Sequence, residues 1–156
     1  MKSKTLWTAF ALTVIVLVSF SAQAGDREYV GATKCKMCHK VQYSSWVATS
    51  HAKATEAAKA STDRTFSPEC LTCHATNASE ELAGVQCEAC HGAGADFKKM
   101  SIMKDPEAAQ ANGLVIPTQA TCDGCHTGDD HAKKVVLADN LNNNAAIHEF
   151  KNPPGE

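Results

Sequence analysis

The sequence has few of the large side chains that usually build a hydrophobic core. Aromatic residues make up only 6% of the 156 positions, and much of the 44% hydrophobic fraction is alanine. Because burial stabilises a fold in proportion to apolar area, each alanine contributes little. No segment shows the alternation of apolar and polar residues that is typical of a strand. We therefore expect a mostly α-helical protein in which something other than side chains completes the interior.

Positive charge is not in excess, and this argues against one class of partner. The chain has 15 Lys and Arg against 17 Asp and Glu, which gives a formal net charge of −2. Without a predicted leader of 24 residues, 13 basic residues remain against the same 17 acidic ones. A domain that binds nucleic acid needs a basic face. We therefore expect no nucleic acid as a partner.

The N-terminal segment has the three parts of a secretory signal peptide. Lys2 and Lys4 give it a basic start, residues 6–20 are mainly apolar, and an A-Q-A tripeptide ends at Ala24. We expect cleavage after Ala24 and export, in a bacterium to the periplasm. The remaining residues 25–156 have the length of a single domain.

All eight cysteines fall into Cys-x-x-Cys pairs, and a histidine follows every pair. The four units read CKMCH, CLTCH, CEACH and CDGCH. In chain order they are Cys35, Cys38 and His39; Cys70, Cys73 and His74; Cys87, Cys90 and His91; and Cys122, Cys125 and His126.

Three kinds of chemistry use paired cysteines, and one of them explains the histidines. An exported chain could form four disulfides, and Cys-x-x-Cys pairs could also bind zinc. Neither requires histidine directly after the second cysteine. The Cys-x-x-Cys-His unit attaches a c-type haem, with both thiols bonded to the porphyrin and the histidine as proximal iron ligand. We therefore predict four covalent haems, numbered one to four in motif order.

Four haems in a chain this short favour electron transfer. The porphyrins would supply the missing core, and their close packing would allow electron tunnelling between them. The motifs begin 35, 17 and 35 residues apart, which predicts that haems two and three form a close pair. Short helices and loops would wrap the haems, with a helix over residues 41–60 and another from Pro106, capped by Asp105, to about Asn112. Residues 133–150 would be helical only in parts.

The histidine count leaves the sixth iron ligands incomplete. Besides the proximal histidines the chain has only His51, His131 and His148, so four haems cannot all have two histidines from this chain. A mainly helical segment would hold His51 far from His39, so it should serve another haem than the first. His148 could return over haem four. His131 follows the polar turn TGDD and is expected to point to solvent, although ligation of another haem stays open.

Methionine is the alternative sixth ligand. Met100 and Met103 follow the third motif, and thioether ligation raises the potential of a haem. Core packing is the more common use of methionine. We expect Met103, before Met100, to replace a missing histidine.

Several stretches resemble the tetrahaem cytochrome c-554 family. They are YVGATKCKMCHKVQYSSWVATSHAKA, CLTCHAT and GVQCEACHGAGADF, and the likeness runs from about Tyr29 to His126. It implies a mainly α-helical fold with haems in stacked pairs. It further implies that His51 is the distal ligand of haem three, that His148 is the distal ligand of haem four, and that haem two is five-coordinate. Members pass electrons from hydroxylamine oxidoreductase towards the quinone or cytochrome pool.

The chain departs from the family pattern after the third motif. The family has a distal histidine for haem one about ten residues after the third motif histidine, and this chain has Met100, Ser101 and Met103 there. The difference favours methionine ligation of haem one.

The leading functional interpretation is an electron carrier of the cell envelope without a catalytic residue of its own. Its partners would be other redox proteins, among them a quinone-linked membrane oxidoreductase. One alternative is a small nitrogen-oxide reductase at a five-coordinate haem, which the presence of only two tyrosines disfavours. The other is a subunit of an extracellular cytochrome polymer, in which a neighbour supplies the missing histidine.

Overall fold

The structure is a computed structural model that describes residues 27–141 and 143–150. Short helices joined by loops make up this part of the chain, and no strand occurs within it beyond isolated bridges of Ala75 with Ala83 and Gly84. The predicted mostly α-helical class is confirmed. The elements are α1 Ala32–Cys35, α2 Lys40–Trp46, α3 Ala54–Ala60, η1 Pro68–Cys70, α4 Leu71–His74, η2 Thr76–Ala78, η3 Glu80–Leu82, α5 Cys87–His91, α6 Met100–Met103, α7 Pro106–Ala111, α8 Gln119–Asp123 and α9 Leu137–Asn140.

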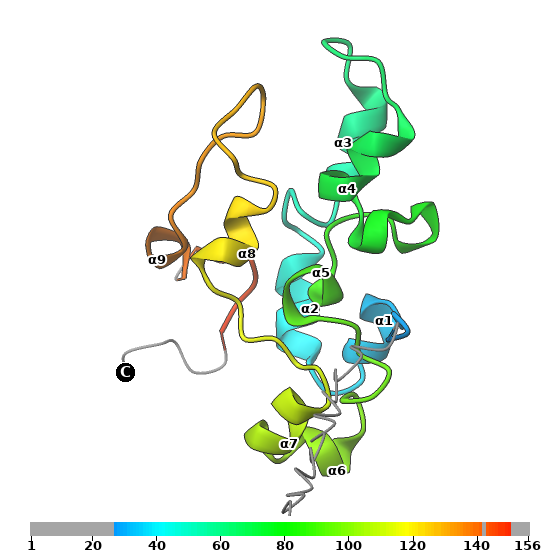
Figure 1. Ribbon diagram of the computed structural model, residues 1–156, viewed down its shortest axis with the longest axis vertical. Helices are drawn as coiled ribbons and strands as arrows, with labels where there is room; N and C mark the ends of the chain where they lie inside the picture. The colour runs from blue at the N-terminus through cyan, green and yellow to red at the C-terminus, as the bar shows by residue number, and fades with distance from the viewer. Residues whose placement is uncertain (1–26, 142, 151–156) are drawn as a thin grey trace, which may run out of the picture.

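The helices are spread along an elongated molecule. Figure 1 shows α3 and α4 towards one end, α6 and α7 at the other, and α2 with α5 between them. The segment that carries α8 and α9 runs beside this body (Figure 1). The predicted leader, residues 1–24, lies outside the described residues. Within the described part, none of the helices combines the length and the apolar character needed to span a bilayer.

The buried apolar core is small, as the composition predicts. Among the residues that the structure describes, it consists mainly of alanines and contains only two large side chains, Leu71 and Phe97. Several large apolar side chains are instead exposed, namely Met37, Val41, Val47, Met100, Val115, Ile116 and Val136. The protein part alone therefore supplies little of the apolar burial that usually stabilises a domain.

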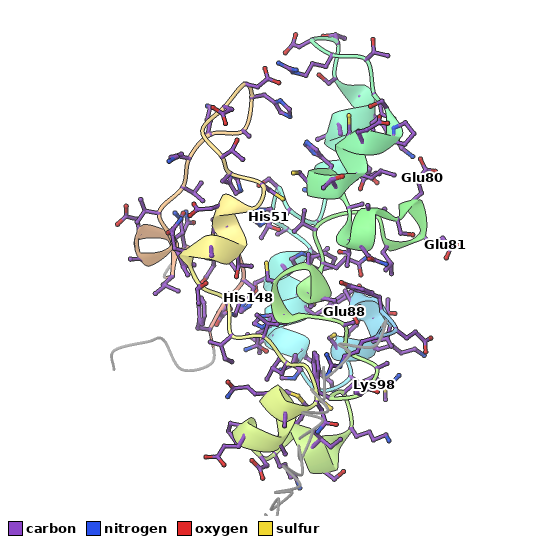
Figure 2. All side chains as sticks on the ribbon, in the orientation of Figure 1. His51, Glu80, Glu81, Glu88, Lys98 and His148 are labelled. Carbon is purple, nitrogen blue, oxygen red and sulfur yellow. The ribbon has the colours of Figure 1, made fainter. Side chains whose placement is uncertain are left out.

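Polar side chains that bind backbone groups organise the middle of the molecule. Glu88 is 2% exposed, and its carboxylate accepts hydrogen bonds from the amides of Val30, Gly31 and Gly94 at 2.7–3.1 Å. The side chain of Gln86 accepts another from the amide of Ala32 at 2.7 Å. Figure 2 shows Glu88 between α5 and α1. These contacts hold the chain before the first motif against the helix of the third.

Two buried threonines fix the second motif in the same way. Thr55 in α3 donates to the carbonyl of His74 and accepts from the amide of Gly84 at 2.7 Å. Thr76 donates to the carbonyl of Gly84 at 3.0 Å and accepts from the amide of Gln86 at 2.8 Å. Residues 84–86 are thus the segment on which α3 and the second and third motifs converge.

The predicted helix over residues 41–60 is interrupted, and that prediction is wrong. The chain forms α2 and α3 with turns between them, because the buried Thr49 binds the backbone on both sides. Its hydroxyl donates to the carbonyl of Trp46 at 2.7 Å and accepts from the amide of Ala52 at 3.3 Å, so it competes with the helical bonds. The interruption places His51 in a turn rather than on a continuous helix face.

The predictions based on local signals hold better. The helix from Pro106 forms as α7, and the Asp105 carboxylate caps it by accepting from the amides of Glu107 and Ala108 at 3.0 and 3.1 Å. Gly113 follows with a φ of 101°. In residues 133–150 only the short helix α9 forms among the described positions, as the expectation of partial helicity allows.

Candidate haem-binding sites

Each Cys-x-x-Cys-His unit contains a helical turn. In the first, the amides of Cys38 and His39 donate to the carbonyl of Cys35 at 3.1 and 2.9 Å, and the fourth repeats this arrangement. The third motif is the whole of α5. Residues three and four apart share a helix face, so the turn brings both sulfurs and the imidazole to the same side. None of the eight cysteines is in a disulfide.

Backbone carbonyls orient three of the proximal histidine rings. The Nδ1 atoms of His74, His91 and His126 lie 3.1, 3.1 and 2.9 Å from the carbonyls of Ala54, Val115 and Lys133. A hydrogen bond from Nδ1–H to a carbonyl fixes the tautomer and leaves the Nε2 lone pair for a metal. These three rings are therefore prepared as iron ligands.

Each of these three rings faces one of the spare histidines. The ring centroids of His74 and His131 are 5.9 Å apart, those of His126 and His51 are 6.1 Å apart, and those of His91 and His148 are 6.3 Å apart. A metal–nitrogen bond of about 2 Å and a ring radius of about 1 Å on each side predict about 6 Å between two imidazoles on one ion. The centroid spacing of each pair thus fits two imidazoles bound to one iron.

Two protein ligands per site suit a porphyrin iron, which receives its other four ligands from the macrocycle. Among the described residues no cluster of three or more His, Cys, Asp or Glu side chains is arranged to hold a metal ion. Burial lowers the pKa of His51, and the neighbouring His126 lowers it further. Burial also lowers the pKa of His91. Both rings are therefore kept in the neutral form that binds metals.

The pairing differs from the one implied by the resemblance. His51 faces His126 of the fourth motif instead of His91, and His148 faces His91 instead of His126. The C-terminal segment beside His148 is held to α2, where the amide of Glu149 donates to the hydroxyl of Ser45 at 2.7 Å. Figure 2 shows His51 and His148 between α8 and the body of the molecule.

The structure places His131, which is expected from the sequence to point to solvent or to serve another haem, beside the second motif. Its side chain is 56% exposed, yet its ring is stacked on that of His74 with an interplanar angle of 14°. The turn before it reverses direction at Asp130, which has a φ of 51°, so the chain returns towards the second motif. His131 thus lies beside the position that the resemblance implies to be open on haem two.

His39 is the proximal histidine that differs from the others. Within the part of the chain that the structure describes, its ring stands in no histidine pair and its Nδ1 has no hydrogen-bond partner. Met100 and Met103 are the first and last residues of α6, and 61% of Met100 is exposed. Methionine ligation at the first motif remains a prediction.

The motifs meet in an order that their spacing does not predict. The side chains of Cys35 and Cys87 are neighbours, and the interaction with Cys87 is the main cause that lowers the pKa of Cys35. The side chain of Cys125 likewise adjoins that of Cys73. Burial, followed by the interaction with Cys73, raises the pKa of Cys125 to about 12. The first motif therefore adjoins the third, and the second adjoins the fourth. The close pair of haems two and three predicted from the spacing stays a prediction, whereas these contacts favour pairs of one with three and two with four.

Comparison with known proteins supports the haem interpretation. Residues 34–92 match the family model described as cytochrome c554 and c-prime. The resemblance to the cytochrome c-554 family is confirmed. The chain is 28% identical to cytochrome c-554 of Nitrosomonas europaea, over 74% of this chain and 65% of that protein. It thus spans about 65% of the length of this curated relative.

A solved structure shows the same fold. The reduced state of cytochrome c554 from Nitrosomonas europaea superposes with a TM-score of 0.61 at 22% identity, covering 80% of this chain and 86% of the solved one. The comparisons support a c-type cytochrome with covalently attached haem iron.

Gly84 provides a test of how His51 is positioned. It has a φ of 79°, and a β-carbon there would lie 2.5 Å from the carbonyl oxygen of Ala52, beside His51. We expect Gly84→Ala to lower the free energy of unfolding by about 2 kcal/mol or more, because a left-handed alanine is strained and the His51 turn must shift. Chemical denaturation of the haem-loaded protein measures the change.

Gly124→Ala is the matched control. The nearest contact of its β-carbon would be 3.6 Å, and the third motif already carries Ala89 at the equivalent place. An equal loss of stability in both variants would contradict the close approach at Gly84.

Proposed function

We propose that this protein is an exported electron carrier that holds four c-type haems and passes electrons between redox proteins of the cell envelope. Three histidine pairs at the spacing of a shared iron carry this proposal, together with four complete attachment motifs. The haems, when bound, supply the one-electron chemistry and tunnelling. The protein holds them, sets their order and chooses their axial ligands.

The cysteines of each motif are the proposed thioether anchors, and the histidine that follows them is the proximal ligand. His131, His148 and His51 are the proposed distal ligands of haems two, three and four. Each faces the proximal ring of that haem at about 6 Å between centroids. Three haems would then be low-spin with two histidines each, and the first would differ.

The contacts between motifs support a linear order of haems. Cys35 adjoins Cys87, and Cys73 adjoins Cys125. Burial raises the pKa of Cys90, and the nearby Cys122 raises it further. The order is therefore one, three, four, two. Electrons would enter and leave near haems one and two, and a quinone-linked oxidoreductase or a soluble redox protein are the proposed partners.

The leader favours export to the periplasm with cleavage after Ala24, which leaves residues 25–156 as the tetrahaem domain.

Met103 is the proposed sixth ligand of haem one, because every spare histidine faces a proximal ring other than His39. A nitrogen-oxide reductase would need an open iron. The pairing leaves such a position only at haem one, where Met103 would fill it.

The haem content tests the proposed function. We expect the exported protein to contain four haems per chain by pyridine haemochrome assay and intact mass, and the double variant Cys70→Ala/Cys73→Ala to contain three. Bound zinc or disulfides in place of haem would refute the proposal, as would an unchanged haem content in the double variant.

Methionine ligation has its own signature. We expect the ferric protein to show the near-infrared charge-transfer band of methionine–iron ligation, and Met103→Ala to lose it with a fall in the potential of one haem. Met100→Ala, three residues earlier in α6, is the control and should keep the band. Loss of the band only in Met100→Ala would make Met100 the ligand instead of Met103. Absence of the band from the wild type would exclude both methionines as ligands.

A further inference from the structure

The three spare histidines are not held equally well. His51 and His148 are half-buried, whereas His131 is exposed and lies in the loop formed by residues 127–133. The turn of His51 is bound to the rest of the molecule, because its carbonyl accepts from the amide of Val85 at 2.8 Å. The segment of His148 is bound to α2 through the next residue, Glu149. His131 depends on other contacts.

One carboxylate secures the His131 loop. An oxygen of Asp130 lies 3.2 Å from Nδ1 of His131, which orients the ring as the carbonyls orient the proximal rings. The other oxygen forms an ion pair with the guanidinium of Arg64. Arg64 belongs to the loop between α3 and η1, and η1 leads directly into α4, which carries His74. We call Arg64, Asp130 and His131 the clasp.

The clasp joins the two sides of one candidate haem site. Arg64 lies on the chain that supplies the proximal ligand, and Asp130 lies on the chain that supplies the distal one. Both side chains are half exposed, 50% for Arg64 and 52% for Asp130. An ion pair at such exposure contributes little to stability, because water and salt screen it. Asp130 also has a left-handed φ of 51°, which is unfavourable for a residue other than glycine. The contact that holds the His131 loop against the second motif is therefore weak.

We propose that Arg64 and Asp130 are positioning residues that hold His131 on the iron of haem two, and that breaking their contact opens this iron to a small neutral ligand such as carbon monoxide. The proposal rests on the proposed function, since it requires His74 and His131 to share an iron. Binding is a ligand substitution without electron transfer. The bond from iron to Nε2 of His131 breaks, the carbon lone pair forms the new bond, and the freed imidazole turns to solvent.

Carbon monoxide binding to the dithionite-reduced, haem-loaded protein tests the clasp. His131→Ala identifies the kinetic phase that belongs to haem two. This variant should bind one more equivalent of carbon monoxide per chain rapidly, in addition to any that binds at haem one. In Arg64→Ala we expect the same haem to bind carbon monoxide about five times faster than in the wild type, because a screened ion pair at the surface holds His131 only weakly. Arg64→Lys retains the charge and should bind at nearly the wild-type rate.

Lys59→Ala is the matched control. It breaks the ion pair of Lys59 with Glu80, which is 3.0 Å long and comparably exposed. It also removes the contact of Nζ with the ring of Phe66, in the loop of Arg64, but neither contact involves Asp130 or His131. Its carbon monoxide kinetics should equal those of the wild type. Equal acceleration in Lys59→Ala and Arg64→Ala would overturn the proposal, as would an unchanged rate in Arg64→Ala.

The same measurements separate this proposal from the one on which it rests. If ferric His131→Ala keeps as many low-spin haems as the wild type by electron paramagnetic resonance, His131 is not a ligand and the proposed ligand set for haem two fails. If His131→Ala gains a high-spin haem and Arg64→Ala changes nothing, the ligand set stands and only the clasp is refuted.

Discussion

The arrangement of histidine rings in facing pairs is the constraint on which the rest of this structure depends. The members of each pair come from segments far apart in the chain, so an iron between them would join those segments as a cross-link does. Metal ligands of this kind couple binding to folding, because the site does not exist in the unfolded chain. With a protein core of a few alanines, Leu71 and Phe97, the fold has little other apolar burial to hold these segments together.

The backbone is prepared for this arrangement by buried polar groups rather than by apolar packing. Glu88 binds the amides of Gly31 and Gly94 from two segments, and Thr55 binds the backbone of both His74 and Gly84. Thr76 binds Gly84 and Gln86, so the two threonines converge on residues 84–86. Their hydrogen bonds are inside the molecule, where leaving a donor unsatisfied costs about 1–3 kcal/mol. They place the motifs beside one another, and the proximal rings are then oriented by backbone carbonyls. The ligands and the scaffold are thus fixed by the same kind of contact.

The sequence predicts what is local and what can be counted. The attachment motifs, the helical class, the cap at Asp105 and the shortage of distal histidines all follow from short patterns. The pairing does not, because it depends on contacts between distant residues. The interruption at Thr49, the contact of Glu149 with Ser45 and the reversal at Asp130 have no signal in the spacing of histidines. Motif spacing does not predict which motifs adjoin one another. The second and third motifs are nearest in the chain, while Cys35 of the first adjoins Cys87 of the third.

A crystal structure of the haem-loaded protein tests the central claim most directly, through the identity of the two axial ligands on each iron. The account predicts that Nε2 of His51 and of His126 lie about 2 Å from one iron, and that His148 with His91 and His131 with His74 flank two others. An iron bound by His51 and His91 together, or a second-motif iron from which His131 is turned away, would contradict it.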